Sequence, residues 1–141
     1  MADKLMVVIP CYNEEQVLPI TAPMFLQKIT SLTEKGMISD KSRVLFVNDG
    51  SSDRTWDIIK EANFRDERFA GLCLDQNRGH QTALTEGLMC AKDKRAVSVS
   101  IDADLQDDVN AIYGFLEKYR EGCDVVYGCL LYTSPSPRDT R

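Results

Sequence analysis

Short apolar segments recur along the chain, and most of them end in a polar cluster. They cover residues 5–9, 43–47, 69–74, 96–101 and 124–127. Runs of this length are typical of strands that are buried on both faces, as in a parallel sheet. We therefore predict a strand at each of these positions.

The segments between these runs carry apolar side chains at helical spacing. They cover residues 14–33, 53–64, 79–91 and 107–120. Each pattern places its apolar residues on one side of a helix, as expected for a helix that packs on a sheet. Pro19 and Pro23 are predicted to break or kink the start of the first helix.

Strands and helices thus alternate, which predicts an α/β fold with a mostly parallel sheet and helices on both faces. In such sheets, ligands bind beyond the carboxyl ends of the strands. Polar clusters follow three of the predicted strands at residues 12–14, 48–50 and 102–107. The sequence therefore predicts a polar site at one edge of the sheet.

Composition narrows the class of protein. The chain has 141 residues, a net charge of -5, 43% hydrophobic and 28% charged residues. These values indicate one soluble domain and argue against a nucleic-acid partner, which would favour a basic surface. No apolar run approaches the roughly 20 residues of a membrane span, and the N-terminus has no signal-peptide pattern, so we expect a soluble, cytoplasmic chain.

The five cysteines form no CxxC pair and no zinc-binding spacing. We expect them to be buried, reduced thiols. The chain also has no GxGxxG, GxxxxGK[ST], GxSxG or HExxH motif. This disfavours a dinucleotide enzyme, a P-loop ATPase, a serine hydrolase of the GxSxG type and a zinc protease.

The segment Asp-Ala-Asp-Leu-Gln at residues 102–106 is a candidate metal site. Residues two apart on an extended segment point the same way, so Asp102, Asp104 and Gln106 can converge. Neighbouring carboxylates repel each other unless a cation lies between them, and oxygen ligands suit Mg²⁺ or Mn²⁺. The structural alternative is a solvated acidic loop that caps the next helix at Asp107.

Three further clusters lie at the same predicted edge. Tyr12 offers a flat face for a base, and Asp49 can accept hydrogen bonds from a ribose or a base. Arg78 lies at the start of a helix, where phosphate binds readily. The alternatives are structural, because Asn13 could cap a helix, and Ser51, Ser52 or Asp53 could cap the next one. His80, the single histidine, is more typical of a surface or cap position than of a catalyst.

Together these motifs resemble family-2 glycosyltransferases, within the branch that acts on polyprenyl phosphates. The resemblance rests on Val-Val-Ile-Pro-Cys-Tyr-Asn-Glu-Glu, Val-Asn-Asp-Gly-Ser-Ser-Asp-Arg-Thr, Asn-Arg-Gly-His-Gln-Thr-Ala-Leu and Asp-Ala-Asp-Leu-Gln-Asp. It covers about residues 5–128. It implies a Rossmann-like nucleotide-sugar-binding fold of the GT-A type, truncated here.

The resemblance also implies the site residues. The nucleotide-binding set is Pro10, Tyr12, Asn13, Glu14, Asp49, Arg78, Asp102 and Ala103. The catalytic pair is Asp102 and Asp104, and the metal set is Asp102, Asp104 and Gln106. The metal would stabilise the departing nucleoside diphosphate as the sugar bond breaks.

The implied activity is the metal-assisted, inverting transfer of a sugar from a nucleotide sugar to a polyprenyl phosphate, in envelope glycan synthesis. A UDP-sugar is favoured over a GDP-sugar. Family members continue past residue 128 with acceptor loops, interface helices and usually two membrane spans. The full-length protein is therefore expected at the cytoplasmic side of the cell membrane, and homo-oligomerisation is left open. The alternatives are a saccharide acceptor, or a non-catalytic module that binds nucleotide sugars.

The last part of the chain differs in character from the rest. We expect residues 1–128 to form an incomplete glycosyltransferase domain that holds the donor site only and is inactive alone, and residues 129–141 to be a disordered tail. Residues 129–139 resemble translated transposase-adaptor DNA, as used in sequencing libraries. An interrupted gene record near Gly128 would explain this, and resequencing the locus from intact DNA tests it.

Overall fold

The computed structural model describes residues 3–101, 103, 125–126 and 131–132. Its elements are β1 (Leu5–Cys11), α1 (Leu18–Glu34), β2 (Arg43–Asn48), α2 (Thr55–Arg65), β3 (Phe69–Cys73), α3 (His80–Asp93), β4 (Val97–Ser100), β5 (Val125–Val126) and β6 (Leu131–Tyr132). The alternation confirms the predicted α/β fold. The helix predicted at 107–120 lies outside the described residues.

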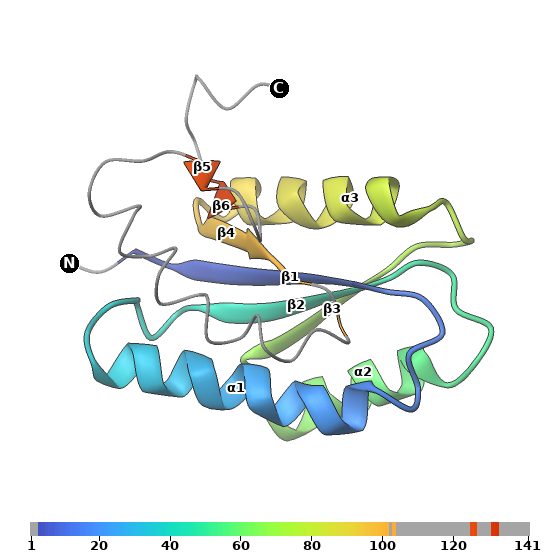
Figure 1. Ribbon diagram of the computed structural model, residues 1–141, viewed down its shortest axis with the longest axis horizontal. Coiled ribbons are helices and arrows are strands. Elements are labelled where there is room, and N and C mark those ends of the chain that lie inside the picture. Colours follow the sequence, from blue (N-terminus) through green and yellow to red (C-terminus); the bar gives the residue numbers. More distant parts are fainter. Residues whose placement is uncertain (1–2, 102, 104–124, 127–130, 133–141) are drawn as a thin grey trace.

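The strands form one sheet in the order β3-β2-β1-β4-β6-β5 (Figure 1). The first four strands in this order are parallel, as predicted. β6 runs antiparallel to both β4 and β5, so the strand predicted at 124–127 joins the sheet through β6. Within 129–141 the structure describes only β6, and the disordered tail stays a prediction.

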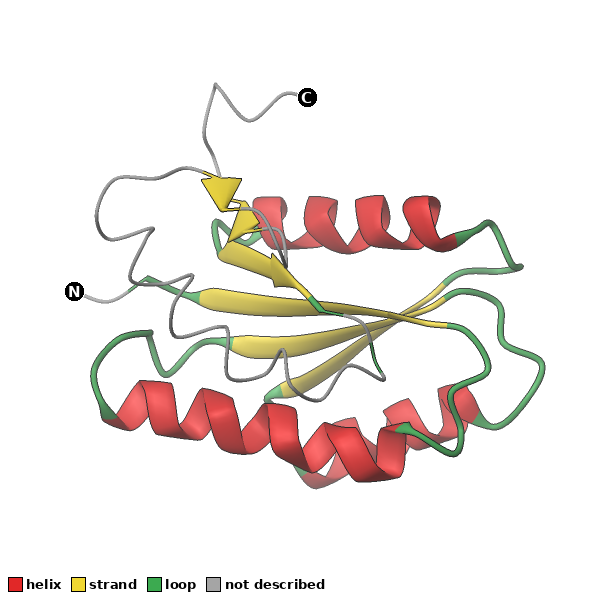
Figure 2. Ribbon diagram, in the orientation of Figure 1, coloured by secondary structure: helices red, strands yellow, loops and turns green. Residues whose placement is uncertain are grey.

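Helices cover both faces of the sheet, as predicted: α1 and α2 lie on one face and α3 on the other (Figure 2). The central strand β1 contributes side chains to the hydrophobic core on both faces of the sheet, because successive side chains of a strand point to opposite faces. Leu5, Val7 and Ile9 pack in the cluster that contains α1 and α2 residues. Met6 and Val8 pack in the cluster that contains α3 residues.

Two helix starts differ from the prediction. α1 begins at Leu18 and not at residue 14, with a proline in its first turn, and it continues through Pro23. α2 begins at Thr55, and neither Ser51 nor Ser52 caps it. Instead, the backbone N–H of Thr55 donates to Asp53 Oδ1 at 2.9 Å.

The expectation of buried thiols is correct for Cys11 and wrong for Cys73, which is exposed. Cys73 ends β3, which lies at the edge of the sheet and has alternating burial. Cys90 is half-buried, and the other two cysteines lie outside the described residues. No helix in the described part of the chain is both long and apolar enough to span a membrane.

Candidate functional site

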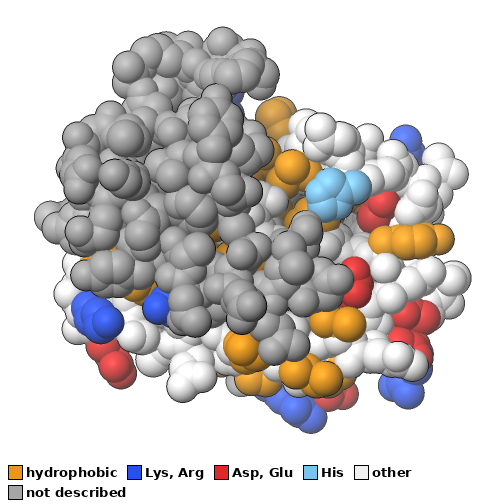
Figure 3. Space-filling view, viewed as in Figure 1, with side chains coloured by type: hydrophobic (Ala, Val, Ile, Leu, Met, Phe, Trp, Pro, Cys, Tyr) orange, Lys and Arg blue, Asp and Glu red, His pale blue; other side chains and the backbone are white. Residues whose placement is uncertain are grey.

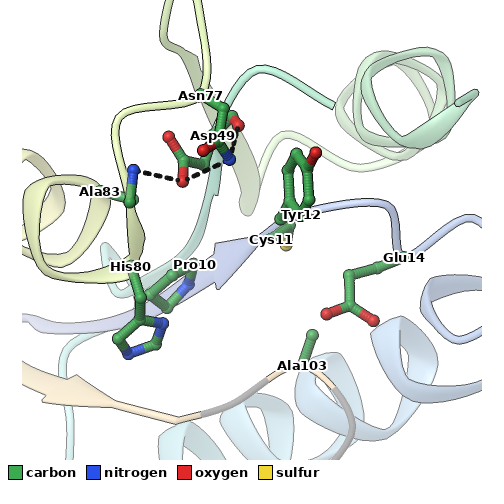
Figure 4. A pocket seen from close by; sticks show the side chains of 10 residues that line it. Pro10, Cys11, Tyr12, Glu14, Asp49, Asn77, His80, Ala83 and Ala103 are labelled. Atoms are coloured by element: carbon green, nitrogen blue, oxygen red, sulfur yellow. Dashed lines mark hydrogen bonds between the residues drawn. The ribbon is translucent and has the colours of Figure 1, made fainter. Parts of the chain in front are cut away.

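A cleft of about 470 Å³ opens at the carboxyl ends of β1 and β2, beside the start of α3 (Figure 4). Pro10, Tyr12 and Glu14 line it from the end of β1 and the loop that follows. Asp49 lines it from the end of β2, and Ala103 from the segment after β4. The predicted polar edge of the sheet is therefore hollowed.

Asp49 is the most buried polar group of the cleft, with 3% of its surface exposed. Its Oδ1 accepts a hydrogen bond from the backbone N–H of Arg78 at 2.7 Å. Its Oδ2 accepts from the backbone N–H of Gly79 at 3.0 Å and from Asn77 Nδ2 at 3.1 Å. The carboxylate thus holds the loop before α3, and these hydrogen bonds use one of the two acceptor positions of Oδ1.

The next residue, Gly50, lets this loop come close. It has a φ of +64°, a backbone conformation that residues other than glycine rarely adopt. A methyl group at this position would overlap the backbone of Gln76 and Asn77. The two loops can therefore meet only because residue 50 has no side chain.

The start of α3 faces the cleft, because Gly79 and His80 both line it. Gly79 occupies the N-cap position, where no side chain caps the helix. The first backbone N–H groups of a helix have no partner within it and carry a partial positive charge. This end of α3 is suited to an anion.

His80 itself is exposed, and Figure 3 shows it at the surface with acidic side chains nearby. Figure 4 shows it in the lining of the cleft together with Pro10. His80 thus lies at the surface, as the sequence favoured, and it also lines the cleft.

The loops after β1 and β2 are joined by side-chain hydrogen bonds. Asn13, which has a φ of +54°, donates its backbone N–H to Ser51 Oγ at 2.9 Å. Its Oδ1 accepts from the backbone N–H of Ser52, also at 2.9 Å. Asn13 therefore braces the loops and caps no helix.

The next residues repeat the pattern. The backbone N–H of Glu14 donates to Thr55 Oγ1 at 2.8 Å, and that of Glu15 to Asp53 Oδ2 at 3.2 Å. Burial raises the pKa of Asp53, but hydrogen bonds from Thr55 and Glu15 outweigh it and hold the pKa below its usual value. Asp53 is thus an ionised acceptor within the joined loops.

Three residues that line the cleft differ in exposure and orientation. Tyr12 is 49% exposed, so its ring is available to a flat ligand. Glu14 points toward Ala103 in Figure 4. Cys11 is buried, and burial, followed by the nearby charge of Glu14, raises the pKa of its thiol. The Cys11 thiol is therefore protonated and a poor nucleophile.

The structure brings together five of the predicted nucleotide-binding residues: Pro10, Tyr12, Glu14, Asp49 and Ala103. It does not bring Asn13 or Arg78 into the lining of this cleft. The guanidinium of Arg78 pairs with Asp75 at 2.9 Å. Asp102, Asp104 and Gln106 lie outside the described residues, so their roles stay predictions.

Sequence reasoning did not select Cys11, Asn77, Gly79 or Ala83, which also line the cleft. Asn77 and Gly79 belong to the stretch from which only Arg78 was chosen. Their place between a strand and the next helix was a usable signal, because such loops lie at the same sheet edge.

The described residues contain no group of three acidic, histidine or cysteine side chains that could hold a metal ion. The predicted ligands flank Ala103 in the sequence, and Ala103 is buried in the lining of the cleft. The metal assignment therefore depends on residues 102, 104 and 106 themselves.

The family model and the similar sequences agree on one family. The family model described as "Glycosyl transferase family 2" matches residues 6–141. An uncharacterized glycosyltransferase of Bacillus subtilis, YkoT, is 46% identical over 124 residues, covering 88% of this chain and 37% of the relative. A prophage bactoprenol glucosyl transferase homolog of Escherichia coli is 33% identical over 123 residues, covering 87% and 38% respectively. The chain thus spans under two fifths of the length of these relatives.

Among solved structures, the mannosyltransferase PcManGT of Pyrobaculum calidifontis, in complex with GDP-Man and Mn²⁺, is similar with a TM-score of 0.51 and 25% identity. The match covers 79% of this chain and 32% of that protein. The shared part is the α/β sheet with its flanking helices.

Proposed function

This chain is a member of glycosyl transferase family 2, and on that premise we propose that its 470 Å³ cleft binds the nucleoside diphosphate of a sugar donor. The fold is the GT-A type. The observation that carries the proposal is that Pro10, Tyr12, Glu14 and Asp49 line one cleft with the start of α3.

Each part of the cleft suits one part of a nucleotide. The exposed ring of Tyr12 can stack on a base, and Asp49 Oδ1 can accept a hydrogen bond from the base or the ribose. The start of α3 can face the phosphates. Arg78 can join them, since an exposed ion pair such as that with Asp75 contributes only about 0–1 kcal/mol.

We further propose that Asp102, Asp104 and Gln106 hold Mg²⁺ or Mn²⁺, with Asp102 and Asp104 as the catalytic pair. Oxygen donors of this kind suit both ions, and the similar mannosyltransferase carries Mn²⁺ with its nucleotide sugar. A bound metal would supply Lewis-acid stabilisation of the leaving diphosphate.

For the longer protein we propose an inverting transfer to a polyprenyl phosphate at the cytoplasmic side of the membrane. The support is the similarity to a bactoprenol glucosyl transferase homolog. The phosphate oxygen of such an acceptor is already anionic, so its attack on the sugar needs little help from a base. We retain UDP as the favoured nucleotide.

Calorimetry with UDP and GDP, each with and without Mn²⁺, tests the donor site. We expect UDP to bind about tenfold more tightly with Mn²⁺, and Asp104→Ala to remove that gain. Asp57→Ala, on the exposed side of α2, is the matched control and should keep it. Equal weak binding with and without metal, in the native chain and in Asp104→Ala, would count against the metal assignment.

A further inference from the structure

A second cleft, of about 360 Å³, lies at the opposite edge of the sheet. It opens at the amino-terminal ends of β1 and β2, where Leu5, Met6 and Leu45 line it. The last turn of α3 contributes Cys90. We call it the amino-edge cleft. Within the described part of the chain it shares no lining residue with the candidate nucleotide site, and the length of β1 separates the two by about 20 Å.

The amino-edge cleft exists because α3 does not cover the whole of its face of the sheet, and the floor of the cleft is apolar. α3 packs on β1, β2 and β4, while β3 lies at the edge of the sheet. Ala70 of β3 is half-buried and packs against the same cluster as Met6 and Leu45. The floor between α3 and β3 is therefore apolar but narrow, because Ala70 and Cys90 are half-buried while Leu5, Met6, Leu45 and Ala96 are buried.

The rim of the amino-edge cleft is basic. Lys4, Lys41, Arg43 and Lys94 line it, and among the described residues no acidic one does. In the part of the chain that the structure describes, none of these four forms an ion pair with a carboxylate within 4.0 Å. The Arg43 guanidinium donates to the carbonyl oxygen of Ser42 at 2.9 Å, so the three lysines are the freer cations.

A cationic rim in a chain with a net charge of -5 is a local reversal of charge. Lysines on an open surface are ordinarily solvated, and an apolar floor alone specifies no partner. A cleft that combines both matches a ligand with an apolar body and an anionic group, because burial of the body places the anion among the cations.

We propose that the amino-edge cleft binds a small organic anion, a phosphate or carboxylate on a compact apolar body, at a site separate from that of the sugar donor. Its volume lies near the lower end of ligand pockets, which favours a soluble molecule of modest size. This inference does not depend on the proposed function, since no residue of the nucleotide cleft takes part.

Titration of the full chain with 1-naphthyl phosphate, followed by backbone amide shifts, tests the proposal. We expect shifts at Met6, Leu45, Ala70 and Ala96, and weaker binding of 1-naphthol and of inorganic phosphate. UDP should not displace the probe from these residues. Shifts confined to Tyr12, Asp49 and Gly79 would place the probe in the nucleotide cleft and overturn the proposal.

Two variants make the test specific. Lys41→Glu with Lys94→Glu should weaken binding about tenfold or more, whereas Lys28→Glu with Lys60→Glu, on α1 and α2, should change it less than about twofold. Ala70→Leu fills the floor without a change of charge and should also weaken binding. Unchanged affinity in both the charge-reversed chain and Ala70→Leu would refute the site.

Discussion

Asp49 connects two parts of the molecule that are far apart in sequence. Its carboxylate accepts hydrogen bonds from three groups of the loop before α3, and its own backbone N–H donates to the carbonyl oxygen of Cys11 at 2.8 Å. The negative charge also lies at the start of α3, where it is favoured by the helix dipole. Asp49 is therefore a structural residue as well as a proposed ligand.

Asp49→Asn tests this double role. The new amide nitrogen would face N–H donors, so we expect a loss of about 1–3 kcal/mol in the free energy of unfolding, measured with urea. UDP binding should weaken as well. The exposed Asp57→Asn should change stability by less than about 0.5 kcal/mol. Equal stability losses in the two variants would contradict the role given to Asp49.

Gly50 allows a second comparison at the residue scale. Gly50 and Gly36 both have positive φ values, +64° and +74°, but only a methyl at Gly50 would overlap neighbouring backbone. Gly36→Ala should lose about 1 kcal/mol through backbone strain alone. Gly50→Ala should lose a further 1–3 kcal/mol or so, because the loop at 76–77 must move. Similar unfolding free energies for the two variants would show that the close approach of Gly50 to residues 76–77 does not affect stability.

At the scale of elements, the loops after β1 and β2 behave as one unit. Five backbone N–H groups donate to side chains across the two segments, those of Asn13, Glu14, Glu15, Ser52 and Arg54. Asp53 is central, since it binds the N–H of Glu15 and that of Thr55. The ionised form of Asp53 therefore stabilises the connection.

The depressed pKa of Asp53 gives a pH dependence with a definite sign. Its stabilising contribution is present above the unfolded pKa of about 3.9 and is lost as the pH falls through the lower folded value. The stability difference between the native chain and Asp53→Asn should therefore shrink below about pH 4. Urea unfolding across this range measures it, with Asp57→Asn as control. A difference that grows on acidification would have the wrong sign.

These elements also show which parts of the fold could be predicted from the sequence. The apolar runs located β1 to β4 within one or two residues at most ends, because burial on both faces leaves a local signal. The start of α1 was predicted four residues early. The N–H groups of Asn13 and Glu14 bind side chains 38 and 41 residues away, and no local pattern reports such a contact.

The same distinction holds for the candidate site. Asp49 and Tyr12 were predictable because they follow strand ends. The partners of Asp49 in the loop at 77–79 were not, since their contact depends on two loops meeting in space and on the absence of a side chain at Gly50. The metal ligands are a sequence prediction that the described residues do not test.

At the scale of the whole molecule, the two clefts lie at opposite ends of the parallel strands. The proposed nucleotide cleft faces the carboxyl ends of the strands, and the amino-edge cleft faces their amino-terminal ends. The chain spans 37–38% of the relatives it matches. The proposed donor site and the proposed acceptor are therefore separate questions for experiment.

We expect the isolated chain to act as a nucleotide-sugar-binding module with little or no sugar transfer. A labelled UDP-sugar, Mn²⁺ and undecaprenyl phosphate supply the components of the proposed reaction. Calorimetry should detect the donor, while extraction of the lipid product should detect almost no label. Transfer at a rate comparable to that of the bactoprenol glucosyl transferase homolog of Escherichia coli, assayed in parallel, would show that this part of the fold suffices.

The bracing of the two loops has a thermodynamic consequence. A flexible loop that closes over a ligand gives up conformational entropy at that moment, and the observed affinity is reduced accordingly. Here the contacts of Asn13, Asp53 and Thr55 restrict the loops in the folded chain before any ligand is present. The ordering cost is met during folding, so the enthalpy and entropy of nucleotide binding should mainly reflect direct contacts and released water.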